Sequence, residues 1–375
     1  MKRILKMILW SVLSLIALLL IVGFIFIKTS PQFGGDHNTQ DIERYTESGH
    51  YKEGKFQNDE ETSMDMNFSN IVGMLRELIK GNPKKSPKED LPMVDLNPKD
   101  VGVADTNRFV WFGHSAFLLQ LDGKNILIDP MLGESPSPHP LLGASRYNDE
   151  LPLEIDELPE IDLLLISHDH YDHLDYGSIQ KLKSKVKEYY VPLGVGAHLK
   201  SWGVDSNTVH EMNWWDEGKV NDINLAFTPS RHFSGRGISD NSSTLWGSWI
   251  IKGEEQNIYF SGDGGYGKHF ADIGEKYGPF DLAFMECGQY NDRWAEIHMT
   301  PEETAQAGKD VKAKVMMPIH WGAFTLALHD WDDPVKRVLE KSKDLDLPVL
   351  VPKIGEKVEL DSLHTNYEAW WKGLE

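Results

Sequence analysis

Seven residues, Ser167-His168-Asp169-His170-Tyr171-Asp172-His173, constrain this chain more than any other part of it. They follow the apolar run of residues 161–166, which predicts a buried strand. Imidazole and carboxylate groups are ligands that suit zinc and similar cations. Alternation along an extended chain places His168 and His170 on one side, and the turn that follows brings Asp172 and His173 to a second position. The loop can therefore supply ligands to two adjacent metal ions, and a merely charged surface segment is disfavoured because a buried strand leads into it.

Three further residues of ligand type follow other apolar runs. His232 comes after residues 225–229, Asp263 after residues 258–262, and His320 after residues 315–319. A lone histidine at a strand end is more often a hydrogen-bonded structural residue. Strand ends, however, present side chains to one rim of a sheet. Together with the first cluster, these residues predict a complete metal site.

Composition excludes some alternatives. The 375 residues suffice for one large or two modest domains, and 40% of them are hydrophobic, which is ample for a core. Cys287 is the only cysteine, so an intrachain disulfide and a cysteine-based zinc site are ruled out. The formal charge of −20 disfavours nucleic acid as a partner. The oligomeric state is left open.

The N-terminus carries a long apolar segment. Residues 7–27 would span about 31 Å as a helix, enough to cross a bilayer core. Lys2, Arg3 and Lys6 precede the segment, so we expect the N-terminus to stay in the cytoplasm and the body of the chain to lie outside the cell membrane. We therefore expect residues 1–28 to form a single-pass anchor. A cleaved signal peptide is the alternative.

Residues 29–100 are predicted to be a linker. Their composition is polar, with few apolar anchors up to about Glu61. Residues 68–80 differ, because apolar side chains recur there at helical spacing, Gly81 suits the position after a helix, and Pro83 blocks its continuation. This amphipathic helix either docks on the main domain or touches lipid.

Residues 101–375 are expected to form the main domain. Asp122-Gly123 predicts a hairpin turn between two strands. Residues 178–186 predict a helix, and Thr300, Pro301 and Glu303 begin another over residues 301–311. Strands alternating with helices, with hairpins included, indicate a layered α/β or α+β domain.

The spacing of these ligand-type residues resembles the metallo-β-lactamase superfamily. Longer strings resemble the group of phospholipases D that hydrolyse N-acylphosphatidylethanolamine, and the match runs from about Asp90 to about His329. The strings are residues 165–176, 227–232, 245–249, 278–283 and 319–322. The resemblance implies a four-layer αββα sandwich with a dinuclear site at one edge of the sheets. The N-terminal apolar segment departs from that group.

The resemblance also implies roles for individual residues. His168, His170 and His232 would hold a first metal ion, Asp172, His173 and His320 a second, and Asp263 would bridge both. His298 corresponds to a histidine near the catalytic centre and would orient or protonate a phosphate oxygen or leaving group; the alternative is that it only caps the helix at Pro301. His114 and Asp129 are expected to support the ligands from behind, and Arg231 and Tyr171 to pack beside them.

The expected activity is hydrolysis of a phosphodiester. Two divalent cations, with zinc expected, lower the pKa of a shared water and deliver hydroxide near neutral pH. An N-acylphosphatidylethanolamine or related membrane phospholipid is the leading substrate, and Asp172, Asp263 and His298 are the catalytic candidates. A lactonase or thioester hydrolase on the same dinuclear site is the alternative enzyme. A membrane-tethered metal-binding protein without turnover is the alternative of another class.

Overall fold

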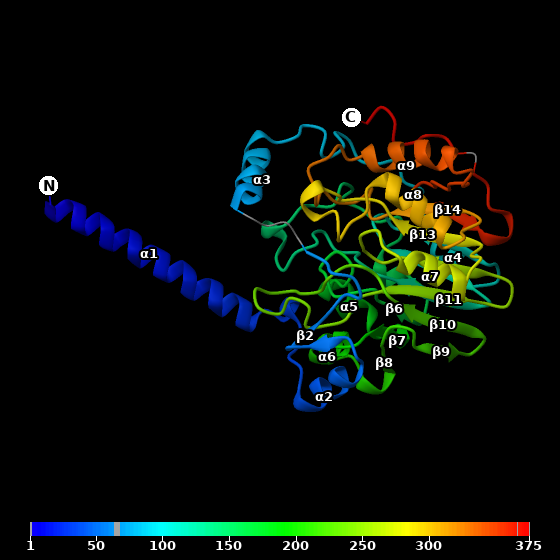
Figure 1. Ribbon diagram of the computed structural model, residues 1–375, viewed down its shortest axis with the longest axis horizontal. Coiled ribbons are helices and arrows are strands. Elements are labelled where there is room, and N and C mark those ends of the chain that lie inside the picture. The colour runs from blue at the N-terminus through cyan, green and yellow to red at the C-terminus, as the bar shows by residue number, and fades with distance from the viewer. Residues whose placement is uncertain (1, 64–67, 366, 375) are drawn as a thin grey trace.

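Two β-sheets lie face to face in the computed structural model, which describes residues 2–63, 68–365 and 367–374 (Figure 1). Within these residues the first sheet has seven strands, in the spatial order β15 (Lys357–Glu359), β3 (Arg108–Trp111), β4 (Phe117–Leu121), β5 (Lys124–Ile128), β6 (Ile161–Leu165), β7 (Val186–Pro192) and β8 (Val209–Met212). The second has six, in the order β14 (Met316–Ile319), β13 (Leu282–Glu286), β12 (Asn257–Phe260), β11 (Ser248–Lys252), β10 (Ile223–Thr228) and β9 (Glu217–Val220). Strands β5 to β8 are parallel, as are β12 to β14.

The hairpin between β4 and β5 shows how the sequence sets the first sheet. Asp122 and Gly123 have φ values of 47° and 74°, the left-handed conformation that a two-residue hairpin turn requires. The antiparallel pairing confirms the predicted turn. Along β4, Phe117 and Leu119 belong to the core shared with the second sheet, while Leu118 faces the outer core. Because successive side chains of a strand point to opposite faces of the sheet, β4 contributes to both hydrophobic cores.

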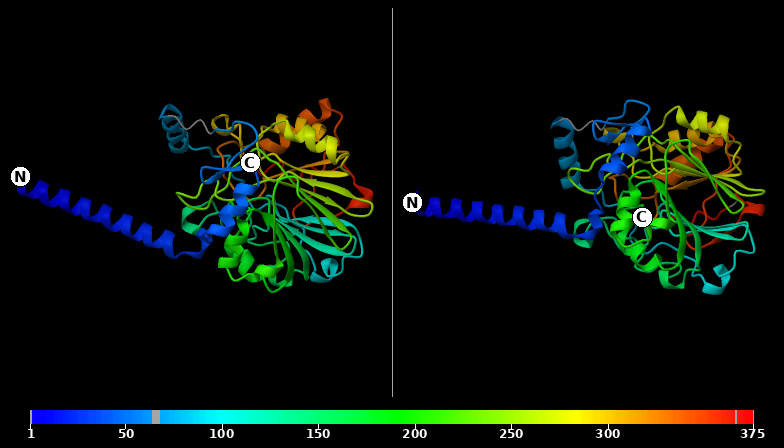
Figure 2. Two further views of the ribbon diagram at one scale, coloured as in Figure 1. Left: turned by 60° about the horizontal axis from the view of Figure 1, so that its bottom comes forward. Right: turned by 90° about the horizontal axis from the view of Figure 1, so that it is seen from below.

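Helices cover the outer face of each sheet (Figure 2). The first sheet packs through a core that includes Val101, Ile179 and Leu199 against α4 (Pro98–Val101), α5 (Tyr176–Leu182) and α6 (Val195–Ser201). The second sheet is covered by α7 (His269–Lys276), α8 (Pro301–Asp310) and α9 (Asp333–Asp344). The order of layers is helices, sheet, sheet, helices, and the predicted αββα sandwich is confirmed.

Helix α8 begins where the sequence predicts, whereas the bounds of helix α5 differ from the prediction. Helix α8 begins at Pro301 with the predicted capping box between Thr300 and Glu303. Helix α5 begins earlier than residue 178, because the Asp175 side chain accepts a hydrogen bond from Ser178 N and caps it. Val186, predicted to end that helix, instead pairs with Ile161 as the first residue of β7.

The segment before the main domain, predicted to be a linker from its polar composition, contains regular structure. It folds into α2 (Thr39–Glu47) and a hairpin of β1 (Tyr51–Lys52) and β2 (Lys55–Phe56). Tyr45 and Phe56 are buried in the main core, with ring centroids 5.3 Å apart. A few aromatic side chains are enough to dock this segment, since each buries a large area. The predicted amphipathic helix is present as α3 (Phe68–Lys80).

Helix α1 (Lys2–Thr29) leads away from the sandwich with no buried residue (Figure 1). Among the described residues it is the helix long and apolar enough to cross a membrane, with a mean hydropathy of 2.8 over its most apolar window. At 28 residues it measures about 42 Å along its axis. Length and composition alone support a span, and a signal sequence passes the same test.

Candidate metal centre

The predicted ligands meet at one edge of the sandwich because parallel strands end there. The loop after β6 carries His168, His170, Asp172 and His173, and Asp263 follows β12. Further ligand-type residues at this edge include His114 after β3, His232 after β10, Glu286 at the end of β13 and His320 after β14. His114 and His320, which are 206 positions apart in the sequence, thus lie at the same edge of the sandwich.

The first group of donors consists of His168, His170 and His232. His170 Nδ1 lies 2.9 Å from His168 Nε2 and 3.2 Å from His232 Nε2, so three ring nitrogens converge on one point. These are the three residues predicted for the first metal ion, and they satisfy the spacing of a metal site. Their side chains are buried or nearly so.

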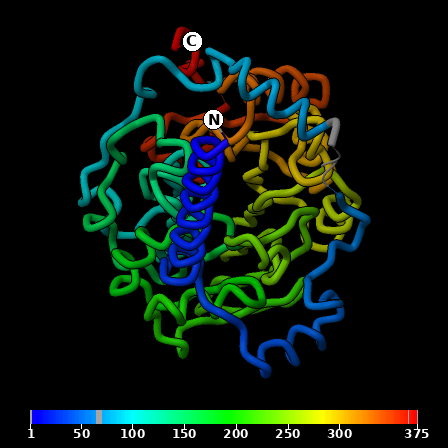
Figure 3. Tube along the Cα trace, turned by 90° about the vertical axis from the view of Figure 1, so that its left-hand side faces the viewer, coloured from blue at the N-terminus to red at the C-terminus, as the bar shows by residue number. Residues whose placement is uncertain are grey.

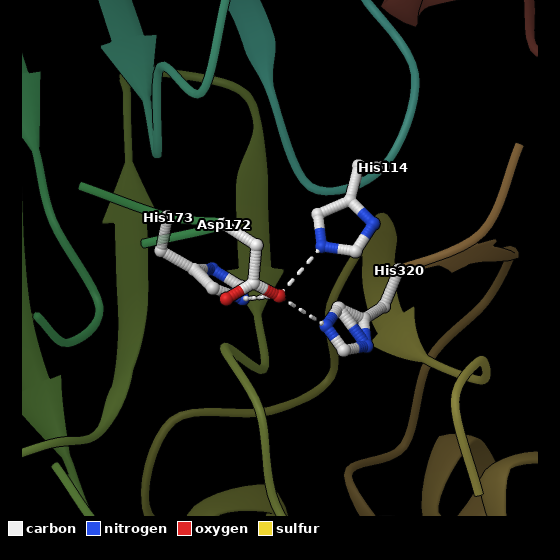
Figure 4. Close-up of side chains that lie close together, drawn as sticks. All are labelled: His114, Asp172, His173 and His320. Carbon is white, nitrogen blue, oxygen red and sulfur yellow. Dashed lines mark hydrogen bonds and ion pairs between the residues drawn. The ribbon is translucent and has the colours of Figure 1, made fainter. Parts of the chain in front are cut away.

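The second group contains the predicted Asp172, His173 and His320 together with His114 (Figure 4). Asp172 Oδ2 lies 2.9 Å from His114 Nε2, 3.1 Å from His320 Nε2 and 3.5 Å from His173 Nε2. The His114 and His320 rings are 4.2 Å apart between centroids. His320 N donates to His114 O and His114 N donates to Trp321 O, so backbone hydrogen bonds hold the two rings together.

Asp263 lies between the two groups. Its Oδ2 is 3.1 Å from His173 Nε2 and 3.0 Å from His320 Nε2. The same oxygen is 3.9 Å from His168 Nε2 and 4.0 Å from His232 Nε2. Its other oxygen, Oδ1, is buried and has no hydrogen-bond partner among the described residues. A buried carboxylate oxygen left without a partner is costly unless a cation completes the site, so the residues present fit a bound metal.

Burial and charge prepare these groups for metal binding. Burial lowers the pKa of His168, His232 and His320 well below the ordinary value, so their imidazoles are neutral, the form that binds metals. Burial alone would raise the pKa of Asp263, but the charge of His173 and its hydrogen bond to the carboxylate outweigh burial and hold the pKa well below the ordinary value. Asp263 is therefore ionised.

Groups behind the donors fix the orientation of the rings. His232 Nδ1 donates to the backbone oxygen of Ile297 at 2.9 Å, which leaves Nε2 without a proton on the side of the cluster. Asp129 accepts hydrogen bonds from Ser167 N and Ser167 Oγ and lies 2.7 Å from His173 Nδ1. Asp129 thus occupies the supporting position expected from its strand end.

Residues 124–321, more than half of the chain, match the family model described as a beta-lactamase superfamily domain. The chain belongs to the metallo-β-lactamase superfamily. It is similar to an uncharacterised protein of Mycobacterium tuberculosis, with 37% identity over 87% of this chain and 88% of that one. It is also similar to N-acyl-phosphatidylethanolamine-hydrolyzing phospholipase D 1 of Caenorhabditis elegans, with 32% identity over 73% of this chain and 81% of that one.

A solved structure supports the fold. Igni18, a metallo hydrolase from Ignicoccus hospitalis, superposes with a TM-score of 0.50 and 24% identity, over 68% of this chain and 97% of that one. As a member of the metallo-β-lactamase superfamily, the protein is a metal-dependent hydrolase. The donor groups above are the residues that this chain offers for the metal.

His298 lies among the candidate metal ligands and does not cap helix α8. Thr300 and Glu303 cap α8, whereas His298 Nδ1 lies 3.1 Å from Glu286 Oε1. The His298 ring stacks on His320 at 5.2 Å and 10°. The His298 side chain is 13% exposed, so it borders both the candidate metal ligands and solvent.

Tyr171 and Arg231 are held by structural contacts, in line with the packing role expected for them. Tyr171 Oη donates to Arg236 O, and the Arg236 guanidinium lies 4.1 Å from the centroid of the Tyr171 ring. Arg231 Nη2 donates to Glu61 O and lies 3.1 Å from Glu296 Oε1.

Glu286 is a site residue that the sequence analysis missed. It is fully buried and ends the apolar strand β13. The signal was the one used for His232, Asp263 and His320, a ligand-type residue after an apolar run.

A cavity of about 330 Å³ borders the metal centre at His232. Its lining includes Phe233, Trp246 and Ile297 together with residues 55–58 and 60–63. Asn58 holds this N-terminal segment against the site, because its side chain donates to His232 O and accepts from His232 N. The segment taken for a linker therefore forms part of the surroundings of the site.

Proposed function

We propose that the protein is a membrane-anchored phosphodiesterase of phospholipase D type, acting on N-acylphosphatidylethanolamine or a related phospholipid. The position of Asp263 Oδ2, within 4.0 Å of ring nitrogens from both donor groups, carries the proposal of a dinuclear centre. The phospholipase D relative supports the substrate class.

Two divalent metal ions, with zinc as the expected metal, fit the two donor groups. His168, His170 and His232 would hold the first, Asp172, His173 and His320 the second, and Asp263 both. Such ions supply an activated water near neutral pH and neutralise charge on phosphoryl oxygens. His114 stays in place behind Asp172, 2.9 Å from its Oδ2.

His298 contributes a proton. Burial alone would lower its pKa, but the hydrogen bond to Glu286 and the charge of that carboxylate raise it above the ordinary value. Nδ1 faces Glu286, which leaves Nε2 to serve the substrate. An imidazolium here stabilises a phosphoryl oxygen or protonates the leaving oxygen.

Helix α1 would hold the enzyme at its substrate. Lys2, Arg3 and Lys6 precede the apolar stretch, which favours a cytoplasmic N-terminus and a catalytic domain outside the cell membrane. Anchoring raises the local concentration of bilayer lipids.

The experiment is metal analysis and a substrate panel on the full chain in detergent. We expect two equivalents of metal per chain and release of phosphatidic acid from N-acylphosphatidylethanolamine. The panel includes phosphatidylethanolamine, a soluble synthetic phosphodiester, an acyl lactone and a thioester. Asp263→Ala should abolish turnover and reduce both equivalents, while Asp222→Ala, at an exposed turn, should change neither. Opening of the lactone or thioester without any phosphodiester cleavage would replace the proposal with the alternative enzyme.

A further inference from the structure

The residues that follow α1 are hydrogen-bonded to α6, to its C-cap Trp202 and to Arg236 in the loop after β10. Residues 31–35, which we call the strap, make three hydrogen bonds to the main domain. Trp202 Nε1 donates to Pro31 O at 2.7 Å, and Arg236 Nε donates to Gln32 O at 2.8 Å. Gly35 N donates to His198 Nδ1 at 3.0 Å. The end of α1 therefore has a defined position relative to the site.

Two of the side chains that hold the strap also hold the loop that carries the predicted ligands. Arg236 Nη1 donates to the backbone oxygens of Asp169 and Leu174. His198 Nε2 lies 3.2 Å from Asp169 Oδ2, and because Nδ1 accepts from Gly35, Nε2 carries the proton and donates. Arg236 and His198 thus bind both the strap and residues 169–174. These shared contacts fix the orientation of α1 relative to the metal centre.

Apolar side chains stand exposed on this same side of the molecule. Leu141, Leu142 and Ile238 are 88%, 69% and 85% exposed. The helical turn with Leu141 and Leu142 begins after His139, whose ring lies 6.2 Å from that of Phe26 in α1. Ile238 lies two residues after Arg236. We call these three residues the apolar rim.

Helix α3 extends the apolar rim. Its Leu75, Leu78 and Ile79 are also exposed, and Figure 1 places α3 on the side of the sandwich from which α1 leaves. Glu77 of α3 pairs with Arg293 at 2.7 Å, in the loop that leads to His298. Figure 3 looks onto this face, with α1 rising from it toward the viewer.

We propose that the apolar rim and the exposed face of α3 rest in the surface of the bilayer that α1 enters. The metal centre then faces the membrane and takes lipid from the same membrane that anchors the enzyme. Isolated exposed leucines are ordinary, but a group of them beside an apolar helix long enough to span a bilayer fits a lipid surface. Residues 137–143 and 237–240 contain no lysine or arginine, and Arg236 is buried, so the contact made by the apolar rim needs no anionic lipid. The cationic side chains of α3 are Arg76 and Lys80. The membrane contact rests on the proposed function in taking α1 as a membrane anchor, and the uptake of lipid rests on its substrate class.

The first test measures contact with lipid and does not depend on activity. Leu141→Cys, Ile238→Cys and Val103→Cys are each labelled with an environment-sensitive fluorophore in the full chain, in vesicles of phosphatidylcholine with brominated acyl chains. Cys287 is buried and stays unlabelled under native conditions. Val103 is the matched control, since it is 65% exposed but precedes β3, at the end of the sheet opposite to His114.

We expect the bromines to quench the fluorophores at positions 141 and 238 and not at position 103, with no change when anionic lipid or salt is added. Absence of quenching at position 238 would overturn the proposal, as would equal quenching at position 103. Disulfide formation between Ile238→Cys copies without quenching would assign the apolar rim to a second copy of the chain instead.

The second test measures use of the surface. In the full chain, the triple substitution Leu141→Asp, Leu142→Asp and Ile238→Asp should lower the rate of hydrolysis of vesicle lipid about tenfold, because charged side chains oppose insertion of the apolar rim into the bilayer. Hydrolysis of a soluble phosphodiester should stay unchanged, and Val103→Asp should affect neither reaction. Equal loss on both substrates would overturn the membrane role. Quenching without any phosphodiester cleavage would instead reject the proposed function and leave the membrane contact standing.

Discussion

Glu286, which is fully buried, and the partly exposed His298 form an acid–base pair at the edge of the metal centre. Glu286 Oε1 lies 3.1 Å from His298 Nδ1, and Glu286 Oε2 accepts a hydrogen bond from Met299 N. Burial raises the pKa of the Glu286 carboxyl to about 7, and the same carboxylate raises the pKa of His298. The pair therefore retains a proton across neutral pH, next to the ring of His320.

Glu286→Gln should lower kcat about 10- to 100-fold and change the pH profile. The acid form of His298 is present below its raised pKa and is lost as the pH rises through that value. Without the carboxylate, the pKa of His298 falls, so the alkaline limb of the kcat profile should move to lower pH. Glu275→Gln, at an exposed position of α7, is the control. A profile that keeps its alkaline limb in Glu286→Gln would contradict the role assigned to the pair.

His114→Gln should weaken one metal position and spare the other. His114 Nε2 contacts Asp172 Oδ2, and the centroid of the His114 ring lies 4.2 Å from that of His320. Among the described residues, His114 forms no hydrogen bond or ring contact with His168, His170 or His232. Loss of such a supporting partner typically lowers metal affinity about 10- to 100-fold. Titration with a chelator, followed by elemental analysis, should show one equivalent released early. His364→Gln, at an exposed position, should release metal as the unchanged protein does.

Gly288→Ala should destabilise the protein and displace His320. A Cβ at residue 288 would lie 1.9 Å from His320 O and 2.8 Å from His320 C, which the backbone of a site residue cannot accommodate without moving. We expect a loss of about 3 kcal/mol in the free energy of unfolding, the range of overpacked cores, and reduced metal content. Gly218→Ala is the matched control, because its Cβ would meet only side-chain atoms, at 3.7 Å and beyond. Normal stability and metal content in Gly288→Ala would refute this packing argument.

His269→Phe should remove part of the acid sensitivity of folding. Burial lowers the pKa of His269 to about 3. The folded state keeps this ring neutral while the unfolded chain binds a proton below about pH 6.5, so the stability is complete above that pH and declines toward pH 3. Between pH 8 and pH 5 the unchanged protein should lose about 2 kcal/mol more than His269→Phe, as measured by urea unfolding of the full chain in detergent. The metal centre titrates in both proteins and cancels in the comparison, and parallel losses would show that His269 is protonated in the folded state.

The segment before the main domain shows where sequence patterns are insufficient. Its polar composition predicted a linker, yet Tyr45 and Phe56 are buried against the main core and Asn58 binds the backbone of His232. The aromatic side chains are few and far apart, so no local period marks them. Their burial depends on a surface that the rest of the chain supplies.

The sequence by itself determined the two sheets and the positions of the ligand-type residues. A buried strand and the residue that ends it are consecutive, so an apolar run followed by His, Asp or Glu can be recognised locally; the same pattern at Glu286 was available. The tertiary structure decided which of these residues meet, that His114 lies beside Asp172 and that His298 pairs with Glu286. It also decided the direction of α1 relative to the metal centre, because this depends on hydrogen bonds from Trp202, Arg236 and His198 to the strap. Contacts between residues far apart in the chain exist only once the sheets have stacked, and no local pattern encodes them.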